Sequence, residues 1–268
     1  MSKHTLLSKR SNVYANSEHT DRHIVAISGG VASAYVAWFV KNNIEGEKIY
    51  YFNDTKWEHP DLYRFINDIE RVLDINIMRD TDGRTPEQVF YDVRMLGSNR
   101  TPICSRILKA ERLQRFVNQG DTLYFGIDPG EIHRAARITP IYQRFGCECK
   151  FPLIDNLVQR DDMFNKIIEL GIEIPQMYKD GFTHNNCSGG CVRAGKKQWV
   201  ALLGKYPDVY AERERVEREF AEFIGKPYTM MKDISLKELR ESVEMQIEID
   251  FGEEEWQGEC MGNCGVMY

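Results

Sequence analysis

Short apolar runs alternate with helical segments through the first half of the chain. The runs have the length of buried parallel strands and lie at residues 23–27, 48–52, 75–78 and 122–125. Residues 32–41 have helical composition, and apolar side chains recur at helical spacing after Pro60. This alternation predicts an α/β fold with a mainly parallel sheet flanked by helices. We expect the stretch between the third strand and Cys104 to be irregular, and residues 109–117 to be helical.

The second half of the chain lacks this alternation. We expect helices at residues 160–170 and 196–203. A third, at 210–223, mixes acidic and basic side chains, Arg213 and Glu217 among them, which predicts a solvated face. No linker rich in Pro, Gly or Ser separates the halves, so we expect a helical lobe packed on the sheet. The expected parts are a flexible N-terminal arm (1–22), an α/β domain (23–157), a smaller helical lobe (158–250) and a cysteine-containing tail (251–268).

Composition excludes several classes of protein. Of the 268 residues, 42% are hydrophobic and 28% charged, which argues against a disordered or collagen-like chain. The net charge of -6 argues against a generally basic nucleic-acid binder. The seven cysteines are an odd number without an apolar export signal, so a disulfide framework is not expected. The apolar stretches are shorter than the roughly 20 residues that span a bilayer, and we expect a cytoplasmic protein without membrane contact.

The turn after the first strand carries the first chemical signal. Ser28, Gly29 and Gly30 precede the helical stretch, and Ser33 lies in its first turn. Glycines let the backbone approach a phosphate closely, and the free N–H groups at a helix start favour an anion. Serine hydroxyls can add donors. The same residues could also form a plain strand–helix turn with a capping serine.

In its spacing this turn resembles the PP-loop of the adenine-nucleotide α-hydrolase superfamily, which grips the pyrophosphate of ATP. Members often have Lys and Asp where Val31 and Ala32 stand here. The resemblance implies a Rossmann-like, HUP-type α/β fold. It also implies that any role of that lysine is absent or supplied from elsewhere.

Further segments resemble the phosphoadenosine phosphosulfate (PAPS) reductase-like branch of this superfamily, in the same order along the chain. They are residues 52–55, 104–109, 126–131 with Arg134, 151–155, and 178–182 followed by Cys187 and Cys191. Two positions depart from the pattern, because Ser105 replaces a second cysteine and Asn156 stands near a tryptophan position. The resemblance covers about residues 23 to 200.

The resemblance also implies site residues. Those expected to act on ATP are Ser28, Gly29, Gly30, Ser33, Asp54 and Lys109. Those expected to contact the nucleotide are the same serines, glycines and Asp54 together with Thr55, Gly126, Asp128, Glu131 and Arg134. ATP is the expected ligand, with Mg²⁺ bound through Asp54, and Lys109 is the best single candidate for a substrate phosphate.

The cysteines raise the question of sulfur or metal chemistry. Soft thiolates select iron–sulfur clusters, and relatives that carry one use cysteine pairs in these two segments. Cys104, Cys187 and Cys191 are therefore the expected ligands of a [4Fe–4S] cluster, with the fourth ligand open. Inert thiols or a zinc site are the alternatives, although no second Cys/His pair has zinc-finger spacing. The roles of Cys260 and Cys264 stay open.

The resemblance favours an ATP pyrophosphatase that forms AMP and pyrophosphate while adenylating a substrate for sulfur incorporation. Nucleic acid is the expected substrate, as DNA phosphorothioate or tRNA, with a cysteine desulfurase as the sulfur donor. The PP-loop ATP pyrophosphatases of DNA phosphorothioation are the nearest in kind. One alternative is a PAPS or adenosine phosphosulfate reductase, which would use a C-terminal cysteine and thioredoxin. A non-catalytic nucleotide-binding subunit is the other, and the oligomeric state stays open.

Overall fold

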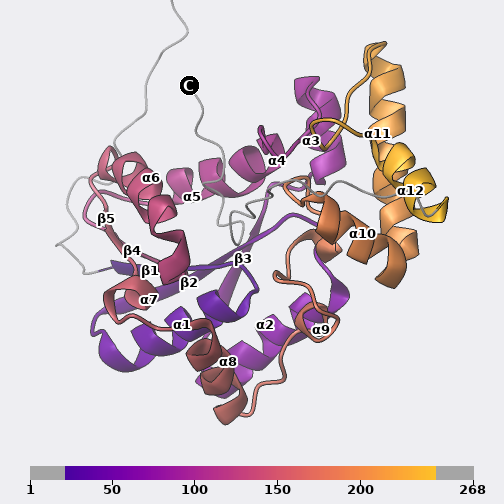
Figure 1. Cartoon of the computed structure of the whole chain (residues 1–268). Helices are drawn as coiled ribbons and strands as arrows, with labels where there is room; N and C mark the ends of the chain where they lie inside the picture. Colours follow the sequence, from indigo (N-terminus) through magenta and orange to yellow (C-terminus); the bar gives the residue numbers. More distant parts are fainter. Residues whose placement is uncertain (1–21, 246–268) are drawn as a thin grey trace, which may run out of the picture.

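Five parallel strands form the centre of the structure, a computed structural model that describes residues 22–245 (Figure 1). The strands are β1 (Arg22–Ile27), β2 (Glu47–Asp54), β3 (Ile77–Thr81), β4 (Thr122–Phe125) and β5 (Glu148–Lys150). They lie in the order β3-β2-β1-β4-β5. Val25 of the central strand pairs with Tyr50 on one side and Tyr124 on the other.

The strand order reverses direction at β1. The chain first builds outward from β1 through β2 to β3, and then returns to place β4 on the other side of β1. Ligands of open α/β sheets bind beyond the carboxyl ends of the strands at such a reversal. The residues that follow β1, β2 and β4 therefore lie where a ligand of this fold would bind.

Helices cover both faces of the sheet (Figure 1). One face packs against α1 (Val31–Asn43), α2 (Pro60–Leu73), α7 (Pro152–Asp155) and α8 (Arg160–Glu169). The other packs against α5 (Glu111–Phe116) and α6 (Ile132–Gln143). Side chains alternate along β1, so Val25 and Ile27 enter the first core whereas Ile24 and Ala26 enter the second. Residues of α8 lie in the first core, which thus continues beyond residue 157.

A third apolar core lies among helices at the right of Figure 1. It joins α3 (Pro86–Val93), α10 (Lys196–Lys205), α11 (Pro207–Ile224) and α12 (Leu236–Glu244). The short helices are α4 (Ile103–Ser105), the π-helical η1 (Arg106–Ala110), η2 (Pro129–Glu131), α9 (Gln176–Lys179) and η3 (Cys187–Gly189). None of the helices within residues 22–245 has the length and apolar character needed to cross a membrane.

The predicted fold class is confirmed, since the structure has a parallel α/β sheet flanked by helices with further helices in its C-terminal part. Two local predictions are wrong. The third strand is Ile77–Thr81 and not 75–78, because its pairing with β2 begins at Ile77. The stretch before Cys104 is not all irregular, since α3 begins there with a capping box between Thr85 and Gln88. The predicted arm and tail, with Cys260 and Cys264, lie outside the described residues.

The prediction of a solvated face for the charged helix is wrong for two of its residues. Arg213 and Glu217 of α11 are 2% and 3% exposed. Glu217 is buried because its two carboxylate oxygens accept the backbone N–H groups of Met230 and Leu236, each at 2.7 Å. A charged side chain can lie inside when backbone groups satisfy it.

Glu217 should make stability depend on pH. Burial raises the pKa of its carboxyl from the ordinary 4.5 to about 7. Between these values the native state holds a proton that the unfolded state has released, so this contribution is complete below about pH 4.5 and is lost as the pH rises through about 7. Urea unfolding of Glu217→Gln between pH 4.5 and 7 should show a weaker fall in stability than the wild type.

Glu217→Gln should also lower the free energy of unfolding by about 1–3 kcal/mol, because its amide NH₂ faces a backbone N–H. Glu222→Gln is the matched control on the same helix, since the Glu222 side chain is 70% exposed. Equal stability and equal pH slopes for both variants would contradict the assignment.

Candidate functional site

Serine hydroxyls shape the turn that joins β1 to α1. The Ser28 backbone N–H and hydroxyl each donate to Ser33 Oγ at 3.1 Å. Ser33 Oγ donates to the carbonyl of Gly30 at 2.9 Å, and Gly30 N–H donates to Ser28 Oγ at 3.3 Å. Both serines are buried. These contacts fold residues 28–33 back on themselves and define the shape of the loop.

At two positions in this region the backbone requires glycine. Gly29 has φ +83°, in the left-handed region, and a Cβ there would lie 2.6 Å from Leu62. Gly126 directly follows β4, and its Cβ would lie 2.8 Å from backbone atoms of Ala32 and Ser33. Only glycine lets the β4 loop come this close to the start of α1. The loops after β1 and β4 therefore form one surface.

The start of α1 offers backbone donors. Its first intrahelical bond runs from Ala34 N–H to the Gly30 carbonyl, so the earlier amides of the turn have no helical acceptor. Val31 N–H donates to the Tyr178 hydroxyl over a long 3.4 Å. The first turn carries no acidic side chain. Such a helix start suits an anion.

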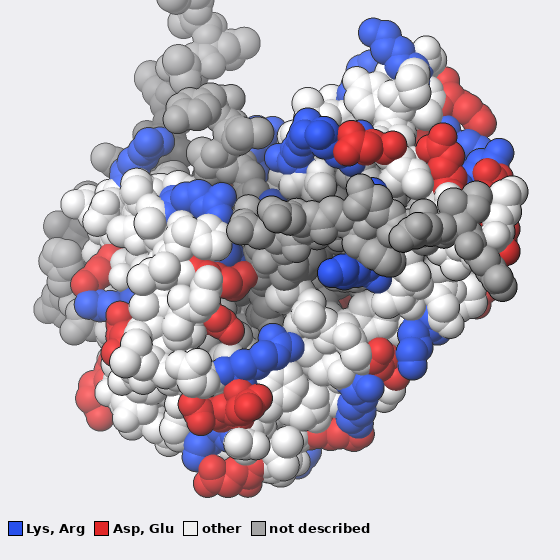
Figure 2. Space-filling view, viewed as in Figure 1, with Lys and Arg blue, Asp and Glu red and all other residues white. Residues whose placement is uncertain are grey.

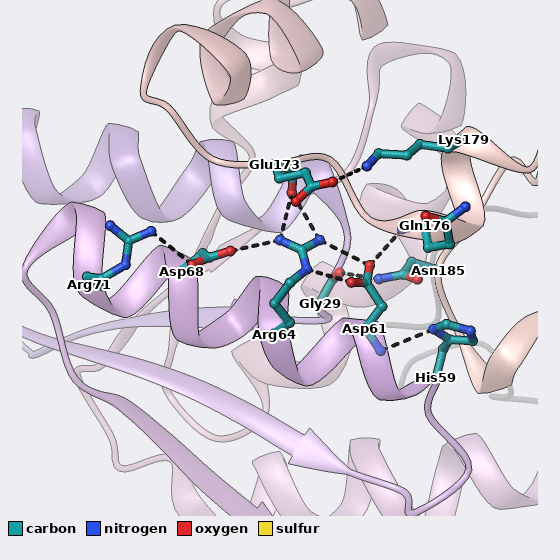
Figure 3. A network of polar contacts seen from close by, with 10 residues as sticks. All are labelled: Gly29, His59, Asp61, Arg64, Asp68, Arg71, Glu173, Gln176, Lys179 and Asn185. Carbon is teal, nitrogen blue, oxygen red and sulfur yellow. Dashed lines mark hydrogen bonds and ion pairs between the residues drawn. The ribbon is translucent and has the colours of Figure 1, made fainter.

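A polar network fixes the loop from the side of α2 and α9 (Figure 3). Asn185 Nδ2 donates to the Gly29 carbonyl at 3.0 Å. Asp61 accepts from Gln176 N–H at 2.7 Å and from the Arg64 guanidinium, which lowers the pKa of the Asp61 carboxyl. Gln176 is thereby held against α2, 115 positions earlier in the chain, and Asn185 against the β1–α1 turn, 156 positions earlier.

The carboxyl end of β2 presents two polar residues. Asp54 Oδ1 accepts from the Tyr63 hydroxyl and from Lys56 N–H, each at 2.8 Å. Burial, together with Asp54, raises the pKa of Tyr63, so the phenol keeps its proton and remains a donor. Thr55 Oγ1 donates to Glu58 Oε1 at 2.9 Å. Asp54 therefore lies at the expected sheet edge, and Thr55 turns toward Glu58.

Glu58 is a residue that sequence reasoning missed. Its side chain is fully buried and accepts from Lys109 Nζ at 3.3 Å and from Cys187 N–H at 2.8 Å. One carboxylate thus joins the end of β2, the π-helical turn η1 and the cysteine segment. Glu58 lies four residues beyond Asp54 in no recognisable motif, so the sequence did not indicate that it is a site residue.

The residues expected after β4 form a second polar group. Asp128 caps η2 by accepting from Gly130 N–H at 2.8 Å, and Glu131 pairs with Arg134 at 2.6 Å. Arg134 is 5% exposed. Burial, and then the charges of Arg160 and Arg134, lower the pKa of His184 to about 3. His184 is therefore a neutral imidazole near two cations.

Three expected cysteine ligands lie in one apolar core. Cys104, Cys187 and Cys191 all belong to the third core, together with Trp57. Hydrogen bonding with Cys191, then burial and the charge of Glu58, raise the pKa of the Cys187 thiol well above its ordinary value. In the arrangement that residues 22–245 adopt, no three Cys, His, Asp or Glu side chains are grouped to hold a metal ion.

Arg213 lies beside this cysteine pair and was also missed. Its guanidinium lies 3.5 Å from the centre of the Trp57 ring, and its Nε donates to the Gly190 carbonyl at 3.3 Å. It also pairs with Glu212 at 3.0 Å. A buried cation near the two thiols would stabilise negative charge on sulfur.

The pair Cys147 and Cys149 lies elsewhere, at β5. Burial raises the pKa of Cys147 to about 11 and that of Cys149 to about 12. Cys147 Sγ donates to the Asn118 carbonyl at 3.2 Å. Both are protonated thiols at neutral pH and hence poor nucleophiles.

Comparison with known proteins identifies the family. Residues 22–192 match the sequence profile described as the phosphoadenosine phosphosulfate reductase domain. The chain belongs to this family. The match ends just after Cys191, so it includes the loop, the β2 and β4 ends and the cysteine pair. No curated protein matches the chain.

Among solved structures, one similar chain is described as "U34-tRNA thiolase NcsA from Methanococcus maripaludis with its [4Fe-4S] cluster". It is 11% identical in sequence, with a TM-score of 0.36. The similarity covers 87% of this chain and 84% of the thiolase chain.

Replacing Glu58 should destabilise this family member strongly. Glu58→Ala takes the carboxylate away from a buried Lys109 and leaves Cys187 N–H without its acceptor, so we expect a loss of about 3 kcal/mol or more in the free energy of unfolding. Glu111→Ala is the control, because its ion pairs with Arg106 and Arg115 are exposed and should contribute about 1 kcal/mol or less. Denaturant unfolding measures both, and similar small losses would show that Glu58 does not join the three segments.

Proposed function

We propose that this protein is an ATP pyrophosphatase that adenylates a substrate for sulfur incorporation. The observation that carries the proposal is the pre-shaped loop at residues 28–33, held by Ser28 and Ser33 against the backbone of Gly126 at the reversal point of the sheet. Its amides lie at the start of a helix that has no acidic side chain in its first turn. Membership of the PAPS reductase domain family agrees with a nucleotide at this position.

In the proposed reaction, a substrate oxygen attacks the α-phosphorus of ATP, and the bond to the β-phosphate oxygen breaks. Pyrophosphate leaves with the bonding electron pair, and the amides of the loop stabilise its growing negative charge. A thiol reductant converts the donor's persulfide sulfur to sulfide, being itself oxidised to a disulfide, and the sulfide then displaces the adenylated oxygen, which departs with AMP. The chain's own part is to hold the phosphates, keep the loop in shape and exclude water around the buried residues.

Asp54 suits the Mg²⁺ that ATP brings. Magnesium prefers carboxylate and phosphate oxygens and would neutralise phosphate charge. The two described hydrogen bonds of Asp54 both reach Oδ1, which fixes the side chain and leaves Oδ2 as the oxygen for a hydrated cation. Lys109, paired with Glu58, lies deeper and nearer the cysteines, where it suits an acidic group of the second substrate.

The acceptor we propose is a nucleic acid, in DNA phosphorothioation or tRNA thiolation, with a cysteine desulfurase supplying sulfur. Basic and acidic side chains are interspersed over the face shown in Figure 2. Contact with phosphates would therefore depend on single cations near the site, such as Arg134, and should be sensitive to salt.

Pyrophosphate release is the test. Wild-type protein with ATP and Mg²⁺ should form pyrophosphate and AMP, assayed with and without DNA or tRNA. Gly126→Ala should lower the rate by about a hundredfold, because its methyl group meets the rigid start of α1 and displaces the loop. Gly204→Ala is the matched control, since a Cβ there meets no atom within 4 Å.

Equal rates in both glycine variants would contradict the proposed loop site. ATP binding without turnover under any condition would instead favour a non-catalytic nucleotide-binding subunit.

A sulfonucleotide reductase is the second candidate, favoured by the family description itself. It would release sulfite from PAPS with thioredoxin as reductant, and would use a C-terminal thiol, Cys260 or Cys264. Both residues lie outside the described part of the chain. Sulfite release that disappears in Cys260→Ser would replace the leading proposal with this one.

The proposal also includes a [4Fe–4S] cluster bound by Cys104, Cys187 and Cys191. Their membership of one apolar core and the nearby Arg213 support an anionic, thiolate-bound group that would serve sulfur transfer, and binding it would require the three thiols to move closer together. The hydrogen bond between Cys187 and Cys191 would then be exchanged for bonds to iron.

Anaerobically purified protein should be brown and contain iron and sulfide. Cys187→Ser should lose most of the iron, whereas Cys147→Ser should keep it, because Cys147 belongs to a different core at β5. Iron analysis and the visible spectrum measure this. Colourless, iron-free wild-type protein would remove the cluster from the proposal.

A further inference from the structure

The phosphate-binding loop contains no cation. Residues 28–33 are serine, glycine, valine and alanine, so they offer only neutral donors. A polyphosphate carries several negative charges, and hydrogen bonds from charged donors are about twice as strong as neutral ones. Beside the Mg²⁺ that ATP brings, a cation from another part of the chain would therefore strengthen phosphate binding at such a loop.

Arg160, the first residue of α8, is held near the loop without an acidic partner. Its Nη2 donates to the Thr183 carbonyl at 3.1 Å. Its guanidinium carbon lies 5.1 Å from the ring centre of Phe164 and 5.7 Å from that of Tyr178. Within residues 22–245 it forms no ion pair with any carboxylate, although its side chain is exposed. A carbonyl and two rings therefore orient a cation whose charge stays uncompensated.

The groups that hold Arg160 also hold the loop. The Tyr178 hydroxyl accepts from Val31 N–H at 3.4 Å, while its ring lies under the guanidinium. Thr183 is two residues before Asn185, which donates to the Gly29 carbonyl at 3.0 Å. Arg160 is thus linked to Val31 through the Tyr178 side chain. It is linked to Gly29 through the segment from Thr183 to Asn185.

Asn185 gives independent evidence of a ligand here. Its side chain is completely buried, and Figure 3 shows it against Gly29. Nδ2 must face the Gly29 carbonyl, so Oδ1 is the remaining polar atom, and it has no hydrogen-bond partner among the described residues. A buried oxygen without a partner costs about 1–3 kcal/mol, which a bound hydroxyl or hydrated cation would recover.

The neighbouring His184 shows that positive charge converges at this place. Besides burial, the charges of Arg160 and Arg134 lower the pKa of its imidazole. Arg134 pairs with Glu131, so its charge is partly balanced. Arg160 has no such partner among the described residues and is the cation left for a ligand.

We propose that Arg160 is the polyphosphate-binding cation of this site, contacting the terminal phosphates of a nucleotide whose phosphate tail lies on the 28–33 loop. The inference rests on the proposed function, because it needs a nucleotide on that loop. Through Arg160 the site would bind nucleotides that have a β- or γ-phosphate more tightly than nucleoside monophosphates. A helix outside the family's loop thereby supplies the charge that the loop lacks.

Calorimetric titration of the full chain with a non-hydrolysable ATP analogue and with AMP tests this. Arg160→Gln keeps a donor for the Thr183 carbonyl but removes the charge. We expect Arg160→Gln to weaken binding of the ATP analogue by about ten- to a hundredfold, because it removes a hydrogen bond from a charged donor. Binding of AMP should weaken by less than about threefold. Arg160→Lys should fall between wild type and Arg160→Gln.

Arg71→Gln is the matched control, an exposed arginine near the far end of α2 that pairs with Asp68. It should bind both nucleotides as the wild type does. Thermal unfolding of each variant establishes that it is folded.

The outcomes separate the two proposals. Wild-type affinity for the ATP analogue in Arg160→Gln would overturn the role of Arg160 and leave the proposed function standing. An equal loss for the ATP analogue and AMP would also overturn it, because it would mean a disturbed loop and not a lost phosphate contact. Wild-type protein that binds no ATP analogue would remove the nucleotide site itself.

Discussion

The buried carboxylate of Glu58 determines how the parts of this structure meet. It accepts from Thr55 at the end of β2, from Lys109 on η1 and from the backbone N–H of Cys187. A desolvated carboxylate is stable only when such donors surround it, so its three partners must arrive together. The cysteine segment is thereby anchored beside the sheet edge that carries the 28–33 loop.

Much of the α/β part could be predicted because its signals are local. An apolar run, a glycine turn and a helical stretch are consecutive in the sequence, and the ends of parallel strands must lie along one edge. Ser28 was found in this way, whereas Asp54 and Gly126 were named through the resemblance to the PAPS reductase-like branch. Helix α3 was missed because its buried residues are few, although the Thr85 capping box was visible in the sequence.

Glu58, Arg213 and Arg160 could not be predicted, for a different reason. Each is important through contacts with residues far along the chain: Glu58 with Cys187, Arg213 with Trp57, and Arg160 with the Tyr178 ring near Val31. In the sequence they are ordinary charged residues, and two of them lie in segments rich in such residues. Only the fold distinguishes a buried or oriented charge from a solvated one.

The cations around the site are of two kinds, those with a carboxylate partner within residues 22–245 and those without one. Three of them have a carboxylate within 3.3 Å: Lys109, Arg134 and Arg213. These ion pairs stabilise the fold and weaken the positive electrostatic potential that the cations offer to a ligand. Arg160 is oriented by a carbonyl and aromatic rings, which fix its position without cancelling its charge. A group that must attract an anion gains from this second arrangement, because binding need not first break an internal ion pair. In the proposed site, a loop of small neutral residues would supply shape and backbone donors, while the separate helix α8 would supply the charge.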